Sequence, residues 1–101
     1  MVNKRKVVWD NFAVNEFKIA YKFFMQSIMK VFANNFKTEI IDATKNLAIF
    51  SEMFKIDRFK IDNDGSFQAF ELFNYRIAYR ITEKQIRILR MRHTSREPLQ
   101  Y

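Results

Sequence analysis

The chain has 101 residues, with 18 Lys and Arg against 11 Asp and Glu, a formal net charge of +7 and one histidine. Hydrophobic residues make up 49% and aromatic residues 17% of it, which is enough for one hydrophobic core and excludes an intrinsically disordered chain. The absence of cysteine excludes disulfides, thiolate zinc sites and a cysteine nucleophile. This length predicts one domain over residues 1–101.

The basic start of the chain is not followed by the apolar run of a secretion signal. Uninterrupted apolar runs elsewhere are far shorter than the roughly 18 residues of a membrane span. We therefore expect a soluble, cytoplasmic protein that makes no membrane contact. A single glycine leaves no glycine-rich phosphate loop, and His93 has no second His or Cys to share a metal, so we expect neither metal nor small-molecule cofactor.

Residues 7–9 predict a short strand, after which Asp10 or Asn11 offers the N-cap of a helix. Apolar residues then recur at spacings of three and four, which indicates a helical hairpin with Ser27 as the second N-cap. Because no Gly or Pro separates the two stripes, one long helix also fits the pattern. The first stripe contains Ala13, Phe17, Ala20, Phe24 and Ile28, and the second contains Phe32, Phe36, Ile40, Ala43, Leu47 and Phe50. The surplus of large apolar residues outside both stripes indicates a partner surface.

The helical period ends after Phe50, and residues 63–66 are typical of a turn. Strands are predicted for residues 67–73, 75–81 and 86–92, with a hairpin loop at 82–85. The middle strand alternates, with Tyr75, Ile77, Tyr79 and Ile81 on one face and Arg76, Ala78 and Arg80 on the other. We predict an α+β fold in which a short N-terminal strand, a helical hairpin and a three-stranded antiparallel meander form one sheet, with the helices on one face.

The positive charge is concentrated near the end of the chain, where only Glu83 and Glu97 oppose it. Six of the eight arginines lie in the last quarter: Arg76, Arg80, Arg87, Arg90, Arg92 and Arg96. We expect them to form one outward cationic surface, suited to phosphate groups or an acidic protein, although a solvated face without a ligand is the alternative. His93 fits a general acid or base, and Tyr101 fits a proton donor or a stacking group; a surface histidine and a mobile terminal tyrosine are the simpler interpretations.

Three segments of the C-terminal third resemble the signature of the RelE/ParE toxin superfamily of bacterial type II toxin–antitoxin systems. They are Tyr75-Arg-Ile-Ala-Tyr-Arg-Ile81, Ile86-Arg-Ile-Leu-Arg-Met-Arg-His93 and Arg96-Glu97. The resemblance implies a growth-inhibiting toxin, of the kind found in plasmid stabilisation systems, that a cognate antitoxin neutralises. ParE-like members inhibit DNA gyrase by binding it, whereas RelE-like members cleave mRNA on the ribosome.

The resemblance also implies roles for individual residues. The catalytic groups of a ribonuclease would be Arg76, His93, Arg96 and Tyr101, and the binding residues would be Arg76, Arg80, Arg87, Arg90 and Arg92. Phe67 and Ala69 stand where RelE-like enzymes carry two lysines, and Glu71 stands where many relatives carry arginine. Because such cations stabilise the charge that develops on the phosphate, their loss favours a ParE-like gyrase inhibitor. A ribosome-dependent mRNA endoribonuclease and a non-toxic antitoxin-binding module are the alternatives.

Overall fold

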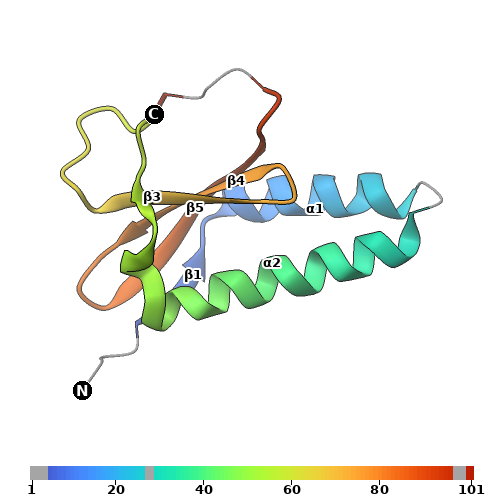
Figure 1. The fold of residues 1–101 in the computed structure, drawn as a ribbon, viewed down its shortest axis with the longest axis horizontal. Coiled ribbons are helices and arrows are strands. Elements are labelled where there is room, and N and C mark those ends of the chain that lie inside the picture. Colours follow the sequence, from blue (N-terminus) through green and yellow to red (C-terminus); the bar gives the residue numbers. More distant parts are fainter. Residues whose placement is uncertain (1–4, 27–28, 97–99) are drawn as a thin grey trace.

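The computed structural model describes residues 5–26, 29–96 and 100–101 (Figure 1). Strand β1 (Lys6–Trp9) leads into helix α1 (Asn11–Met25), and helix α2 (Lys30–Phe50) ends in a short 3-10 helix, η1 (Ser51–Met53). Strands β2 (Lys55–Ile56), β3 (Phe67–Leu72), β4 (Tyr75–Ile81) and β5 (Gln85–His93) follow. The predicted α+β class, with its N-terminal strand and helical hairpin, is confirmed.

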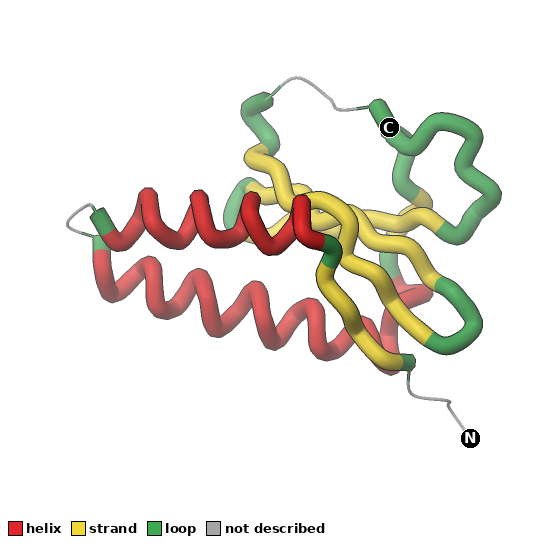
Figure 2. Tube along the Cα trace, turned by 180° about the vertical axis from the view of Figure 1, so that it is seen from behind, coloured by secondary structure: helices red, strands yellow, loops and turns green. Residues whose placement is uncertain are grey.

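Within the described part of the chain, the strands form one sheet in the order β1-β5-β4-β3-β2. Strands β1 and β5 pair in parallel, and the other neighbours pair antiparallel, which confirms the predicted meander. Strand β2 was not predicted, because its two residues are too few to show an alternating pattern. Figures 1 and 2 show α1 and α2 side by side along one face of the sheet. No helix in the described ranges is long and apolar enough to cross a membrane.

The core lies between the two helices and this face of the sheet. Its buried strand residues are Ile77 and Tyr79 of β4 and Ile86, Ile88 and Met91 of β5, and its helix residues include Ala13, Ala20, Phe36, Ile40 and Leu47. All these helix residues belong to the predicted stripes. Phe50 was also predicted in the second stripe but is 52% exposed, because the buried stripe of α2 passes instead through Thr44 to Ser51, just beyond the helix.

The helix caps differ from the prediction in detail. Asp10 is the N-cap of α1, but its carboxylate makes no hydrogen bond to the helix backbone and binds Arg87 at 2.9 Å instead. Met29 is the N-cap of α2, so the predicted cap at Ser27 is wrong. Ser27 and Ile28 themselves lie outside the described residues. Because α1 ends at Met25 and α2 begins at Lys30, the two stripes form a hairpin and not one long helix.

Two turns connect the elements around β3. In the predicted turn at 63–66, Gly65 has a φ of 95° and donates its backbone N–H to Asn63 Oδ1 at 2.8 Å. Strand β3 ends one residue earlier than predicted, because Phe73 and Asn74 form a two-residue turn with φ values of 54° and 65°. Positive φ at both positions matches the twist of the strands, and packing of the Phe73 ring on Phe32 and Phe36 compensates for its backbone strain.

A β-bulge in β5 decides which way its arginines point. The register with β4 skips Leu89, which lies between Ile88 and Arg90. One unpaired residue shifts the alternation of side chains by one position. Arg87 therefore shares a face with Arg90 and Arg92, although strict alternation would place it on the opposite face. That shared face is the one turned away from the helices.

Candidate functional site

The face of the sheet opposite the helices consists of three rows of side chains across β3, β4 and β5. The rows are Glu71, Arg76 and Arg92; Ala69, Ala78 and Arg90; and Phe67, Arg80 and Arg87. Because alanines occupy two places in the middle row, they leave a hollow between larger neighbours. A pocket of about 210 Å³ lies at Ala78.

The pocket brings together part of the predicted site. Among the predicted residues, Arg76, Arg90, Arg92, His93 and Arg96 line it. Residues that were not predicted complete the wall: Asp57, Arg58, Phe59, Glu71, Ala78 and Thr94. Arg80 and Arg87 form the row at the other end of the β4–β5 hairpin and are not among the lining residues.

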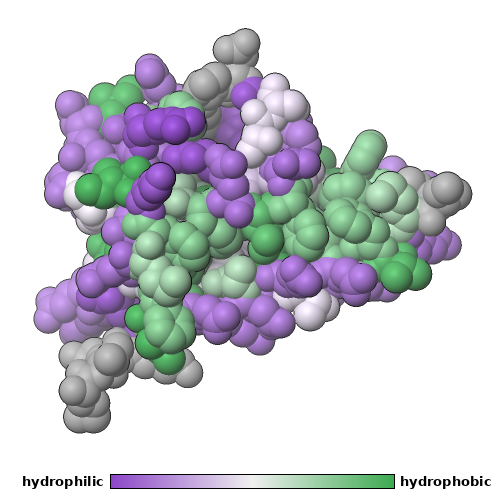
Figure 3. All heavy atoms as spheres, in the orientation of Figure 1, coloured by the Kyte–Doolittle hydropathy of each residue, from purple (hydrophilic) through white to green (hydrophobic). Residues whose placement is uncertain are grey.

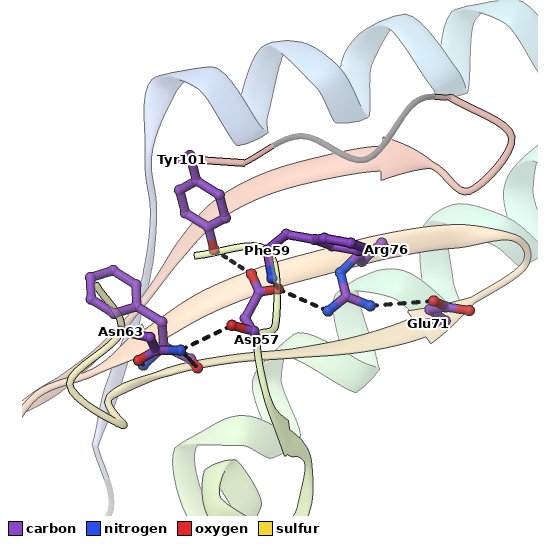
Figure 4. A network of polar contacts seen from close by, with 7 residues as sticks. Asp57, Phe59, Asn63, Glu71, Arg76 and Tyr101 are labelled. Atoms are coloured by element: carbon purple, nitrogen blue, oxygen red, sulfur yellow. Dashed lines mark hydrogen bonds and ion pairs between the residues drawn. The ribbon is translucent and has the colours of Figure 1, made fainter. Parts of the chain in front are cut away.

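Asp57 organises the polar contacts beside this pocket (Figure 4). It is 1% exposed, and its carboxylate accepts hydrogen bonds from Arg76 Nη2 at 2.8 Å, the Tyr101 hydroxyl at 2.6 Å and the Phe59 N–H at 3.0 Å. Asn63 also donates its side-chain amide to the Asp57 carbonyl at 3.0 Å. Asp57 was not predicted as a site residue, because it lies in a segment without periodicity, 19 residues from Arg76.

Arg76 faces away from the helix-packed core, as predicted, but two carboxylates neutralise it. Its Nη2 lies 2.8 Å from Asp57 Oδ1, and its Nη1 lies 3.3 Å from Glu71 Oε2. Its guanidinium group also lies over the ring of Phe59, 4.7 Å from the centroid. Arg76 therefore has a structural role in anchoring the segment that follows β2.

Tyr101 is fixed by the same segment. Its backbone N–H donates to the Phe59 carbonyl at 3.1 Å, and its carbonyl accepts from the Ile61 N–H at 2.7 Å. Burial raises the pKa of the Tyr101 hydroxyl far above its ordinary value, and the hydrogen bond to Asp57 raises it further. This hydroxyl consequently keeps its proton near neutral pH and is a poor acid or base.

His93 lies at the end of β5, with its ring edge-on to Tyr75 at a centroid distance of 5.2 Å. Its Nδ1 accepts the backbone N–H of Ser95 at 3.1 Å and lies 2.7 Å from the Ser95 hydroxyl. An Nδ1 that accepts a hydrogen bond carries no proton, which assigns the neutral ring its proton on Nε2. In this geometry, His93 is a hydrogen-bond donor through Nε2.

Three more of the predicted arginines have carboxylate partners. Arg90 binds Glu16 of α1 in a bidentate pair, with distances of 3.1 and 2.9 Å, and the same carboxylate accepts the Met91 N–H at 2.8 Å. The other two pairs are Arg87 with Asp10 at 2.9 Å and Arg80 with Asp64 at 3.8 Å. The expected cationic surface is therefore largely neutralised within the protein.

Arg92 and Arg96 differ from these arginines. Neither forms an ion pair with another of the described residues. The Nε of Arg92 is also buried without a hydrogen-bond partner there. Arg58 also lines the pocket without an ion pair to a described residue, and its guanidinium group lies over the Phe59 ring, 4.8 Å from the centroid. The unneutralised charge of the pocket thus comes from Arg58, Arg92 and Arg96. Over the same described ranges, no group of three or more His, Asp or Glu residues is placed to hold a metal ion.

Comparison with known proteins decides the family. A family model described as the ParE toxin of the type II toxin–antitoxin system parDE matches residues 7–98. This chain belongs to the ParE toxin family. The match includes every helix and strand except the first residue of β1, so the resemblance of the C-terminal segments to the RelE/ParE superfamily is confirmed. No curated protein matches the chain.

Solved structures share the fold of this ParE-family chain. The chromosomal ParDE TA system from P. aeruginosa matches with a TM-score of 0.70 and 17% identity, over 90% of this chain and 97% of that one. Two structures of the E. coli DinJ-YafQ complex match with TM-scores of 0.53 and 0.52 and identities of 15% and 14%. Each covers 91% of this chain, and 96% and 94% of its own.

The ParE-family chain should lose stability in acid because of Asp57. Burial alone raises the pKa of Asp57, but hydrogen bonds from Tyr101, Arg76 and Phe59 outweigh it and hold the pKa below its ordinary value. The stabilisation is therefore complete well above the unfolded pKa of about 3.9 and is lost as pH falls through the folded pKa. We expect the urea midpoint to be level from pH 7 to about 5 and to decrease below about pH 4. An Asp57→Asn variant should decrease less over this range, and identical slopes would contradict the assignment.

Proposed function

We propose that this chain is the toxin of a type II toxin–antitoxin pair that acts in the cytoplasm, inhibits DNA gyrase by binding it, and is neutralised by a cognate antitoxin. The family match over residues 7–98 carries the proposal. The likeness in fold to a ParDE system and to a DinJ-YafQ toxin–antitoxin complex supports an antitoxin partner. We also propose that residues 1–101 act as one domain, because both helices and the sheet share one core.

An exposed apolar surface supports protein binding. Figure 3 shows a hydrophobic band that crosses one face of the molecule between two hydrophilic regions. The segment from the end of α2 to β2 exposes Ile49, Phe50, Met53, Phe54 and Ile56. Apolar surfaces of this kind mark contact sites for other proteins. We propose that the antitoxin covers such surface and pairs acidic residues with the arginine face.

The state of the predicted catalytic residues favours binding over RNA cleavage. Cleavage needs a group that moves a proton and free cations that stabilise charge on the phosphate. The Tyr101 hydroxyl keeps its proton and donates it in a hydrogen bond to the Asp57 carboxylate. The charge of Arg76 is neutralised by Asp57 and Glu71. The binding residues in this proposal are Arg76, Arg80, Arg87, Arg90 and Arg92.

One observation favours mRNA cleavage as a second candidate. His93, Arg92 and Arg96 line the same pocket, next to Arg76. In a ribonuclease, His93 would first have to be protonated on Nδ1, which means giving up the hydrogen bond from the Ser95 N–H. The resulting imidazolium could then donate its Nε2 proton to the leaving oxygen, while the guanidinium groups would stabilise the phosphate.

Purified toxin should inhibit supercoiling of relaxed plasmid by gyrase and should trap gyrase on cleaved DNA. Arg80→Gln and Arg87→Gln each remove a charge from the proposed contact face, and we expect each to raise the half-inhibitory concentration about tenfold, the effect of about 1.4 kcal/mol. Lys45→Gln, on the exposed side of α2, is the control and should leave the half-inhibitory concentration unchanged.

Codon-position cleavage of mRNA with unaffected gyrase would support the ribonuclease instead. Unaffected growth after strong expression would indicate a non-toxic antitoxin-binding module.

A further inference from the structure

We infer that the pocket at Ala78 is a binding site for one phosphate group, with Arg92 and Arg96 as its main ligands. Inhibition of gyrase by protein contact does not require such a site, so the inference goes beyond the proposed gyrase inhibition, whereas the mRNA cleavage given as the second candidate would use the same site. It rests on the lining of the pocket, the partners of each arginine and the balance of charge.

Arg92 is the first reason for this assignment. It lies directly opposite Arg76 on the neighbouring strand, where two like charges repel each other. Asp57 and Glu71 both bind the guanidinium group of Arg76 and outweigh its single charge, but neither forms an ion pair with Arg92. No carboxylate of the described residues binds Arg92. An anion in the pocket would supply the opposite charge that this side chain lacks.

The net charge of the pocket matches a phosphate better than a carboxylate. Five guanidinium groups line it: those of Arg58, Arg76, Arg90, Arg92 and Arg96. Among the residues that the structure describes, Asp57 and Glu71 line it as well, and Glu16 neutralises Arg90 from α1, which leaves two positive charges. A phosphate monoester carries about −1.5 to −2 at pH 7, whereas a carboxylate carries a single negative charge.

The donors around the pocket also suit a phosphate. Guanidinium groups bind phosphate oxygens through paired N–H donors, and three of them at this site, those of Arg58, Arg92 and Arg96, have no competing carboxylate among the described residues. Thr94 adds a hydroxyl to the wall, and His93 adds its Nε2 proton. A volume of about 210 Å³ leaves room for one phosphate group with water molecules around it.

Titration of the full chain with inorganic phosphate at constant ionic strength tests this site. We expect saturable NMR shifts of the Arg92 side-chain Nε–H and the Thr94 amide, with a Kd of about 1 mM or below. Arg92→Gln should weaken binding at least tenfold. Arg92→Lys keeps the charge but loses the paired donors, so its affinity for phosphate should lie between those of Arg92→Gln and the unmodified protein. The control variant Lys45→Gln should bind phosphate normally, and thermal unfolding establishes that each variant is folded.

Further ligands distinguish the sources of the anion. Acetate at equal ionic strength should shift these signals far less than phosphate does, and equally tight acetate binding would overturn the assignment in favour of an acidic protein segment. A dinucleotide with a 5′-phosphate is compared with the same dinucleotide without that phosphate. Tighter binding of the first indicates that the site binds a phosphate monoester, and equal binding of both indicates that it binds a nucleic-acid backbone. No saturable shift at a hundredfold excess of phosphate would also overturn it. Because these experiments measure binding without gyrase, their failure leaves the proposed inhibition untouched.

Discussion

Replacing Asp57 with alanine should lower the free energy of unfolding by about 3 to 5 kcal/mol, the loss typical of removing one partner from a buried ion pair. The Asp57 carboxylate is the common acceptor for Arg76, Tyr101 and the Phe59 N–H, so its removal leaves three donors without their partner. For a chain of this size, such a loss lowers the thermal midpoint by more than about 12 °C. Thermal and urea unfolding at pH 7 measure it.

Asp42→Ala is the matched control for this substitution. Asp42 lies on the exposed side of α2, and its removal should change the stability by less than about 0.5 kcal/mol. Tyr101→Phe removes one of the three donors to Asp57 and should lower the stability by about 1 to 2 kcal/mol. If Asp57→Ala and Asp42→Ala unfold at the same midpoint, Asp57 does not anchor the segment after β2.

Replacing Phe36 with alanine should lower the stability by a similar amount, about 3 to 5 kcal/mol. Phe36 is fully buried at the centre of an aromatic cluster between the helices and the β3–β4 turn. Its ring centroid lies 5.1 to 6.2 Å from those of five other rings: Phe17, Phe24, Phe32, Phe73 and Tyr75. The substitution removes both the transfer free energy of the ring and the contacts around the cavity that it leaves. Urea unfolding followed by circular dichroism measures the loss.

Two variants make the Phe36 prediction specific. Phe36→Leu keeps most of the volume and should lower the stability by about 1 to 2 kcal/mol. Phe23→Ala removes a ring from α1 that is 66% exposed, so it should cost less than about 1 kcal/mol. An equal loss for Phe23→Ala and Phe36→Ala would contradict the placement of Phe36 at the centre of the core.

Periodicity predicted the parts of this fold that bury one apolar face. The spacing of Phe36 and Ile40 identified α2, and the alternation of Ile77 and Tyr79 identified β4, because both patterns depend only on neighbours in the sequence. The bulge at Leu89 gives no such signal, because it is defined by the register with a second strand. For this reason, the face to which Arg87 points required the structure.

The sequence predicted the positively charged side chains of the candidate site but not the carboxylates that pair with them. Counting charges along the last quarter of the chain found only Glu83 and Glu97 opposite the arginines. Folding brings Asp10 to Arg87 and Glu16 to Arg90 from 77 and 74 residues away, distances over which sequence patterns carry no information. As a result, the arginines were found from the sequence, while their neutralisation was not.

The parallel pairing of β1 with β5 has a consequence for biosynthesis. The partner of Val7 is Ile86, so β1 leaves the ribosome long before the strand that completes its hydrogen bonds has been translated. Until residues 85–88 emerge, the nascent chain carries a helical hairpin whose apolar face has no sheet to cover it. This fold is completed only after residues 85–88 have emerged, and a chaperone that shields the hairpin until then would protect it from aggregation.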